Sequence, residues 1–101
     1  MAKVIWSAPA LAQLESIIDY IALDKPGAAR AIASRVFDST DRLEHFLRLG
    51  QPIHEFKHKN YRQVWMKPCW LYYRIEEDTV FILHVRRAET PLHLEDLAAE
   101  E

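Results

Sequence analysis

The chain has 101 residues; half are hydrophobic, 28% are charged, and the formal net charge is −2. This length suits one folded domain, expected over residues 1–101, and the composition argues against intrinsic disorder. Cys69 is the only cysteine, which excludes an internal disulfide and a cysteine-based metal site and fits a reducing cytoplasm. We expect no signal peptide, because only three apolar residues follow Lys3 before Ser7 and Pro9. We expect no membrane association, because no apolar run approaches the ~20 residues that span a bilayer.

Charge is unevenly distributed along the chain. Residues 95–101 carry four acidic residues and no basic one, within a tail that begins at about residue 89. By contrast, no acidic residue lies between Glu55 and Glu76, a stretch that contains Lys57, Lys59, Arg62, Lys67 and Arg74. We interpret the tail as a solvated helix end, with shielding of the basic stretch as the alternative.

The first half of the sequence predicts a strand followed by two helices. Lys3 to Trp6 is a short strand-like run, after which Ser7 and Pro9 mark a helix start. Apolar residues at steps of three and four continue that helix to about Leu23: Leu11, Leu14, Ile17, Ile18 and Ile21. After a break at Asp24-Lys25-Pro26, a second helix precedes Gly50 and Pro52, and its apolar face comprises Ala29, Ile32, Ala33, Val36, Phe37, Thr40, Leu43 and Leu47. The short link predicts an antiparallel helical hairpin.

The second half predicts three strands after a polar connection over residues 51–60. They cover Tyr61 to Met66, Cys69 to Ile75 and Thr79 to Arg87, and two short turns join them into an antiparallel meander. The order β-α-α-β-β-β is an α+β fold, in which the hairpin covers one face of a largely antiparallel sheet. Around Leu92, Leu94 and Leu97 the sequence allows either a short last helical turn or a flexible tail.

Alternation along the strands predicts which side chains are exposed on the other face of the sheet. On the second meander strand, Leu71, Tyr73 and Ile75 are expected in the core, opposite Trp70, Tyr72 and Arg74. On the flanking strands, Tyr61, Gln63 and Trp65 oppose Arg62, Val64 and Met66, while Phe81, Leu83 and Val85 alternate with Val80, Ile82, His84 and Arg86. Exposed rows of large rings are uncommon on monomers, so we expect another molecule to cover Trp70, Tyr72 and Arg74. The alternative is that a loop or the C-terminal tail covers them.

Few residues indicate catalysis. A ribonuclease needs cations that stabilise the charge on the scissile phosphate and a group that transfers protons. Arg62, Arg86 and Arg87, with His84 nearby, are suitable residue types, but no spacing ties a histidine pair to one site. His54 and His58 lack an indicated third ligand, so we expect no metal and no other cofactor.

The whole chain resembles the RelE/ParE superfamily of bacterial toxins from type II toxin–antitoxin systems, and it is closer to the ParE branch. The resemblance covers about residues 3 to 88 and depends on the order and spacing of its pieces. These are Val4-Ile5-Trp6-Ser7, Ala10, Leu14, Asp19-Tyr20-Ile21-Ala22, Pro26, Ala28-Ala29, Leu43, Leu49-Gly50, Pro52, Tyr72-Tyr73-Arg74-Ile75 and Ile82-Leu83-His84-Val85-Arg86-Arg87.

This resemblance implies a compact toxin and a cognate ParD-like antitoxin, which wraps the toxin with a disordered or helical C-terminal segment. We expect that segment to be acidic, because the toxin strands are basic. We assign antitoxin binding to the helical-hairpin surface and to Trp65, Trp70, Tyr72 and Arg74. Target binding is assigned to Arg62, Arg86 and Arg87.

The superfamily also implies two activities. ParE-like members act on DNA gyrase without chemistry of their own, whereas RelE-like members cut messenger RNA on the ribosome. This chain has Val64 and Trp70 where the ribonucleases carry basic residues, and no tyrosine after Arg87. We therefore predict a non-enzymatic gyrase inhibitor. The alternatives are a RelE-like mRNA endonuclease, using Arg62, His84, Arg86, Arg87, Lys57 and Lys59, or a degenerate toxin that retains only antitoxin binding.

Overall fold

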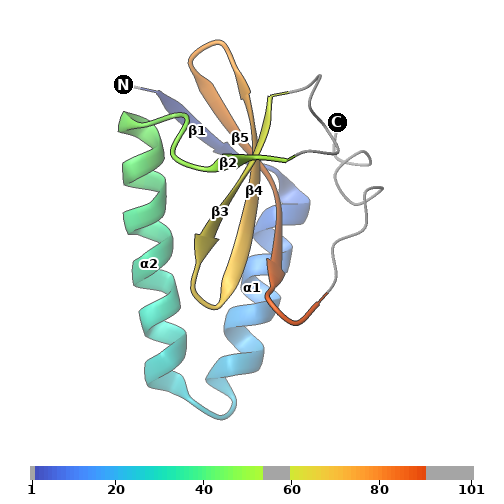
Figure 1. The fold of residues 1–101 in the computed structure, drawn as a ribbon. Helices are drawn as coiled ribbons and strands as arrows, with labels where there is room; N and C mark the ends of the chain where they lie inside the picture. The colour runs from blue at the N-terminus through green and yellow to red at the C-terminus, as the bar shows by residue number, and fades with distance from the viewer. Residues whose placement is uncertain (1, 54–59, 91–101) are drawn as a thin grey trace.

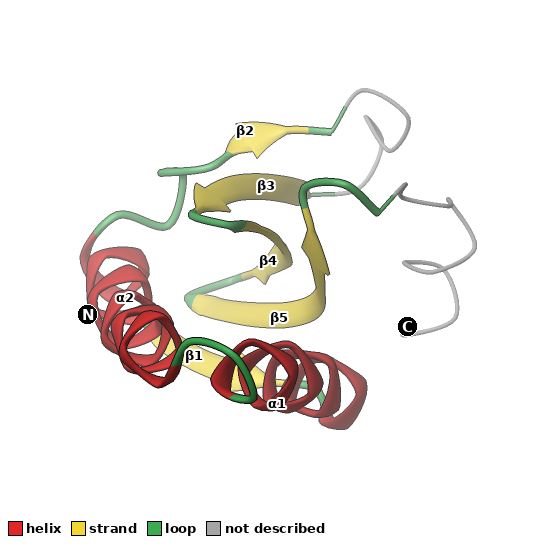
Figure 2. Ribbon diagram, turned by 90° about the horizontal axis from the view of Figure 1, so that it is seen from below, coloured by secondary structure: helices red, strands yellow, loops and turns green. Residues whose placement is uncertain are grey.

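A mixed five-stranded sheet carries two helices side by side on one of its faces (Figures 1 and 2). The computed structural model describes residues 2–53 and 60–90. The elements are β1 (Lys3–Trp6), α1 (Ala8–Ala22), α2 (Pro26–His45), β2 (Gln51–Pro52), β3 (Tyr61–Met66), β4 (Cys69–Glu76) and β5 (Thr79–Arg87). The predicted α+β order is confirmed, with one strand added. Predictions for His54, Lys57, His58, Lys59 and the tail from residue 91 lie outside the described residues.

The added strand is β2, which lies in the connection that the sequence predicted to be only polar. Its two residues pair antiparallel with β3, through Gln51 opposite Gln63 and Pro52 opposite Arg62. A two-residue strand that contains proline has no alternating pattern, so the sequence offers no strand signal there.

The strands lie in the order β1-β5-β4-β3-β2, and only β1 runs parallel to its neighbour. Beyond the end of β1, residues around α1 continue the pairing with β5. The Ser7 N–H donates to the Ile82 carbonyl at 2.9 Å, and the Val85 N–H donates to Gln13 Oε1 at 2.8 Å. The first helix is therefore fixed to the sheet by polar contacts as well as by its apolar stripe.

Both helix starts follow the predicted signals. Ser7 caps α1, because its hydroxyl accepts from the Ala10 N–H at 3.1 Å, and a proline lies in the first turn of each helix. Lys25 is the residue before α2, and it makes no side-chain capping bond. Among residues 2–53 and 60–90, no helix combines the length and apolar character needed to cross a membrane.

The main core lies between the helices and the sheet. As predicted, Leu71, Tyr73 and Ile75 of β4 are buried there, together with Ala10, Leu14, Ile32, Leu43, Met66, Cys69, Val80, Ile82 and Val85. The expectation for two residues of the apolar helix stripes is wrong: Leu11 is 43% exposed and Phe37 is 75% exposed. Both helices carry more apolar surface than the sheet covers.

A β-bulge changes the predicted faces of β5. The register shifts between Tyr72 and Tyr73, which pair with His84 and Ile82, so that Leu83 is the extra residue. Ile82 and Val85 consequently both face the main core, whereas strict alternation had placed them on opposite faces. Leu83 instead joins Ile53, Tyr61 and Tyr72 in a second buried cluster.

The second cluster corrects the prediction for Tyr72. Its side chain was expected on an exposed face, but it is only 1% exposed. Trp70 and Phe81 are partly buried and pack against the same cluster. The face opposite the helices therefore has its own apolar centre, and only its margins are accessible.

The hydroxyl of Tyr73 joins the sheet to the connection between α2 and β2. It donates to the Leu47 carbonyl at 2.7 Å and accepts from the Gly50 N–H at 2.9 Å. Gly50 lies so close that a Cβ there would be 2.6 Å from the Gln63 carbonyl oxygen and 2.9 Å from the Tyr73 ring. Burial, the largest effect, raises the pKa of Tyr73 above its ordinary value of 10.0, against the Gly50 hydrogen bond and the charges of Arg62 and Arg48.

We expect Gly50→Ala to lower the free energy of unfolding by about 1–3 kcal/mol, because backbone and ring atoms must move to admit the methyl group. Gly27→Ala is the matched control, since the nearest atom to its added Cβ is an Arg30 guanidinium nitrogen at 3.9 Å. It should be neutral, or stabilise α2 by up to ~1 kcal/mol. Urea unfolding measures both, and equal effects of the two substitutions would contradict the close approach at Gly50.

Tyr73→Phe should cost about 1–3 kcal/mol at neutral pH, because it removes the partner of two backbone groups. The raised pKa adds a pH dependence: above 10.0 the unfolded chain loses the tyrosine proton first, so stability falls as pH rises through the folded value. The variant should show a shallower alkaline loss of stability than the wild type. Tyr20→Phe, at a 62% exposed residue, should leave both measurements unchanged.

Candidate binding surfaces

A row of three side chains crosses the sheet face opposite the helices. Trp65 of β3 pairs with Trp70 of β4, which pairs with Arg86 of β5. The two indole rings are 5.1 Å apart and tilted by 58°, and Trp65 is 48% exposed. The structure therefore brings together three of the predicted site residues in a partly open aromatic strip.

Arg86 holds the chain that follows β5 against this face. Its Nε donates to the Tyr72 hydroxyl at 2.7 Å, and its NH1 group donates to the carbonyls of Arg87, Ala88 and Thr90, the last at 2.6 Å. Burial, more than the opposing effect of Arg86, raises the pKa of Tyr72. The Tyr72 hydroxyl thus remains a neutral acceptor for Arg86.

The three arginines predicted to bind the target point in three different directions. Arg62 donates to the Gly50 carbonyl at 2.6 Å and to the Arg48 carbonyl at 3.4 Å. Arg86 lies on the face opposite the helices, whereas the neighbouring Arg87 turns to α1, where its guanidinium lies 5.1 Å from the Tyr20 ring centre and pairs with Glu89. These three groups do not converge on a common point.

The other predicted site residues have structural contacts too. Arg74 lies over the Phe81 ring at 4.7 Å and pairs with Glu76 at 2.7 Å. The His84 ring is 5.9 Å from the Tyr72 ring. Cys69 is fully buried, and burial raises the pKa of its thiol, which disfavours the reactive thiolate. Within residues 2–53 and 60–90, no three histidine, cysteine, aspartate or glutamate side chains are grouped to hold a metal.

A second candidate surface is an apolar groove of about 310 Å³ on the helical hairpin. Thr40 is the one polar residue among its described lining, which also includes Trp6, Leu11, Ile18, Ala33, Val36 and Phe37. The sequence indicated this surface only in general terms. A sharper signal was available, because the combined apolar stripes of the two helices are wider than the face that a two-layer fold covers.

Comparison with known proteins assigns the chain to a family. A family model described as the ParE toxin of the type II toxin–antitoxin system, parDE, matches residues 4–91. No curated protein sequence matches the chain. Among solved structures, the chain is similar to one of the chromosomal ParDE toxin–antitoxin system from P. aeruginosa, with a TM-score of 0.70, 20% identity, and coverage of 88% of this chain and 98% of that chain.

A second similar structure is the RelBE2 toxin–antitoxin complex from Mycobacterium tuberculosis. It gives a TM-score of 0.57 and 23% identity, and the match covers 85% of this chain and 96% of that chain. At these identities the two structures support the fold, whereas the family match extends over most of the chain. The protein therefore belongs to the ParE toxin family of type II toxin–antitoxin systems, within the RelE/ParE superfamily that its sequence predicted.

Proposed function

We propose that this toxin acts by binding DNA gyrase, without chemistry of its own, and that a cognate antitoxin neutralises it. The absence of chemistry is inferred from Arg62, Arg86 and Arg87, because their guanidinium groups bind other groups of this same chain. Stabilisation of a phosphoryl transition state requires donors held toward the point where charge develops. These guanidinium groups instead satisfy carbonyls, a tyrosine hydroxyl and a glutamate of the same chain.

The second candidate function is RelE-like cleavage of messenger RNA. The fold likeness to the RelBE2 complex favours it, as does the 36% exposure of the Arg87 side chain. Arg62, His84 and Arg86 are the other described residues on which it would rely. Arg62, Arg86 and Arg87 bind partners in different parts of the fold, which makes this the weaker candidate. A degenerate toxin that binds only an antitoxin is the third.

Ectopic expression separates these functions. We expect growth arrest with filamentous cells, an induced DNA damage response and intact messages, and the purified chain should inhibit supercoiling by DNA gyrase. Message cleavage that depends on the ribosome, mapped by primer extension, would establish the second candidate instead. Normal growth at a verified protein level would favour the degenerate toxin.

The hairpin groove is the surface that we propose for the antitoxin. Phe37 and Leu11 expose apolar side chains at its margin, and contiguous exposed apolar surface on a small monomer marks an interaction site. A groove between two helices accepts the apolar face of an amphipathic helix. An antitoxin segment that folds on binding supplies such a helix.

The aromatic strip of Trp65 and Trp70 is proposed as a second antitoxin contact, with Arg74 nearby on β4. Tryptophan and arginine are the residue types that most often dominate interface energies. Tyr72, assigned to the same site by sequence, is buried, and Trp70 packs against the cluster that contains it. The basic residues around these strands favour an acidic antitoxin segment, so the affinity should fall as salt is added.

Phe37→Ser should weaken antitoxin binding about tenfold or more, because it removes the largest exposed apolar side chain of the groove. The antitoxin to test is the product of the neighbouring open reading frame, and calorimetry measures the affinity. Trp65→Ala should also weaken antitoxin binding. Phe46→Ser is the matched control, since Phe46 is 65% exposed but lies beyond the end of α2, outside the groove. Equal affinities for Phe37→Ser and the wild type would exclude the groove.

A further inference from the structure

The end of the molecule where α2 stops presents a second, separate apolar surface. Phe46 follows the last residue of α2 and is 65% exposed. It lines a recess of about 510 Å³ together with Leu47, Arg48 and Leu49. The Leu49 N–H donates to the Phe46 carbonyl at 3.1 Å, which closes this segment into a turn. Leu47 and Leu49 are partly buried against the main core, whereas Phe46 stays exposed.

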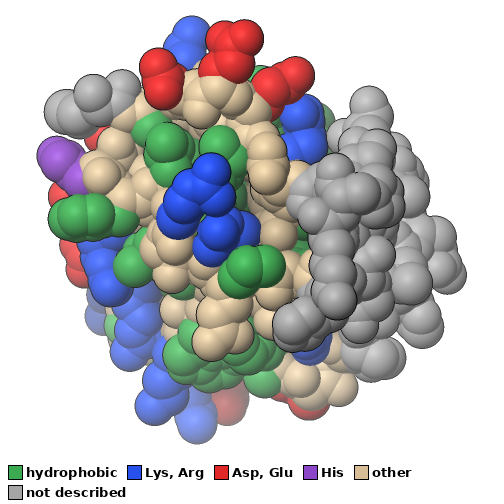
Figure 3. All heavy atoms as spheres, turned by 45° about the horizontal axis from the view of Figure 1, so that its top comes forward, with side chains coloured by type: hydrophobic (Ala, Val, Ile, Leu, Met, Phe, Trp, Pro, Cys, Tyr) green, Lys and Arg blue, Asp and Glu red, His purple; other side chains and the backbone are tan. Residues whose placement is uncertain are grey.

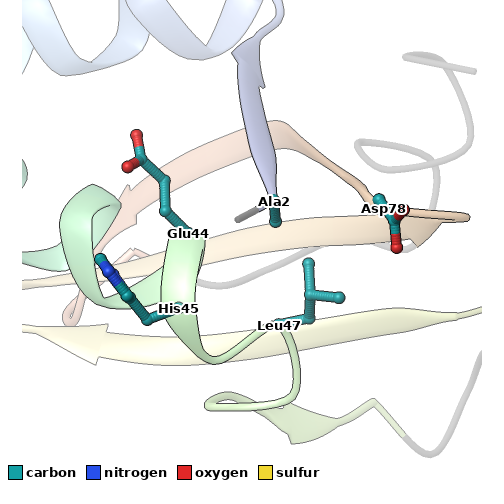
Figure 4. Close-up of a pocket in the computed structure, with 5 residues that line it drawn as sticks. All are labelled: Ala2, Glu44, His45, Leu47 and Asp78. Atoms are coloured by element: carbon teal, nitrogen blue, oxygen red, sulfur yellow. The ribbon is translucent and has the colours of Figure 1, made fainter.

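Leu47 also borders a neighbouring recess of about 300 Å³, which Figure 4 shows in close-up. Ala2 and Leu47 form its apolar centre, and the carboxylates of Glu44 and Asp78 lie on either side of them. Two backbone hydrogen bonds fix this arrangement, because the Ala2 N–H donates to the Glu44 carbonyl at 2.8 Å and the Lys3 N–H donates to the Asp78 carbonyl at 3.0 Å.

The ionisable residues that line this recess are mainly acidic, namely Glu44 and Asp78. Its remaining described lining residue is His45, and no lysine or arginine is among the residues described as lining it. Glu76, the last residue of β4, and Glu77, on the turn with Asp78, are both exposed. Figure 3 shows acidic side chains gathered at one end of the molecule, at the top of the view, with basic side chains beside them and further down. The nearest basic groups in sequence are Lys3 and Arg48, which flank Ala2 and Leu47.

We propose that this end of the molecule, comprising Glu44, Phe46, Leu47 and Asp78, is the docking surface for the toxin's target protein. It fits a segment in which an arginine or lysine lies beside a large apolar side chain. The methylene stem of the cation packs on Ala2 and Leu47 while its charge meets the two carboxylates, and the apolar neighbour packs against Phe46. This inference rests on the proposed function in taking gyrase as the target.

The acidic residues of this recess favour a basic partner over the antitoxin. The antitoxin segment inferred above is acidic, and like charges across an interface cost binding energy, so Glu44 and Asp78 disfavour it here. The hairpin groove runs between α1 and α2, whereas this recess lies at the end of α2, beside the start of β1 and the β4–β5 turn (Figure 1). A helix bound in the groove would still obstruct a partner as large as gyrase by its bulk.

Two variants test the surface: Phe46→Ser, and the double charge reversal Glu44→Lys with Asp78→Lys. Each should raise the concentration of toxin that half-inhibits purified DNA gyrase about tenfold or more and relieve growth arrest in cells. Antitoxin affinity should remain that of the wild type. The matched controls are Phe37→Ser, which should lose antitoxin affinity and keep gyrase inhibition, and Asp38→Lys, on the exposed side of α2, which should change neither.

Thermal unfolding of each variant checks that the fold is kept, and the milder pair Glu44→Gln with Asp78→Asn should weaken inhibition in the same direction. Variants that arrest growth as the wild type does would overturn the docking surface. A wild-type chain that arrests growth without inhibiting gyrase would overturn the gyrase proposal alone, and the variants' relief of that arrest would still support the surface. A wild-type dimer that both variants dissociate would overturn the docking surface in favour of self-association.

Discussion

The contact between Tyr73 and Gly50 is the constraint on which both layers of this fold depend. β4 lies at the centre of the sheet, and Tyr73 extends from it to two backbone groups of the chain that leaves α2. The contact brings β2 against β3 and lets the Gly50 carbonyl accept from Arg62. It also sets where the Phe46–Leu49 turn leaves the helix layer, which positions the exposed apolar surface at that end.

Periodicity and capping predicted the regular elements because each depends on local chemistry. The bounds of β1, β3 and β5 agree with the sequence, and Ser7 caps α1 as its side chain requires. The bulge in β5 is different, because it follows from how two strands pair rather than from a residue in either one. For that reason alternation alone could not predict the shared face of Ile82 and Val85. The burial of Tyr72 depends on Ile53, Tyr61 and Leu83, which come from other segments of the chain.

The site was predicted less completely than the fold for a related physical reason. Residue type showed that arginines and tryptophans are concentrated in the strands, but it carried no information about which polar partners the backbone would offer them. Arg62 and Arg86 each meet carbonyl groups left unpaired where elements end, at Gly50 and at Thr90. Gly50 is buried, so its carbonyl needs a donor, whereas the bond to the Thr90 carbonyl is exposed; both arginines stabilise chain connections. Their residue type alone had suggested target binding or, as the alternative, a ribonuclease site.

The paired arginines and the exposed apolar side chains of this chain favour a binding function over a catalytic one. Catalysis on phosphate would need charged donors kept unpaired and aimed at one point, at a cost in stability that the rest of the fold must offset. In the described part of this chain, the arginines of the sheet are paired, while large apolar side chains stay exposed on the hairpin and at the end of α2. Exposed apolar surface carries a cost in water that only another molecule removes. The two exposed apolar surfaces have neighbouring residues of different charge. Such a pair of surfaces suits a small toxin that binds an antitoxin with one surface and its target protein with the other.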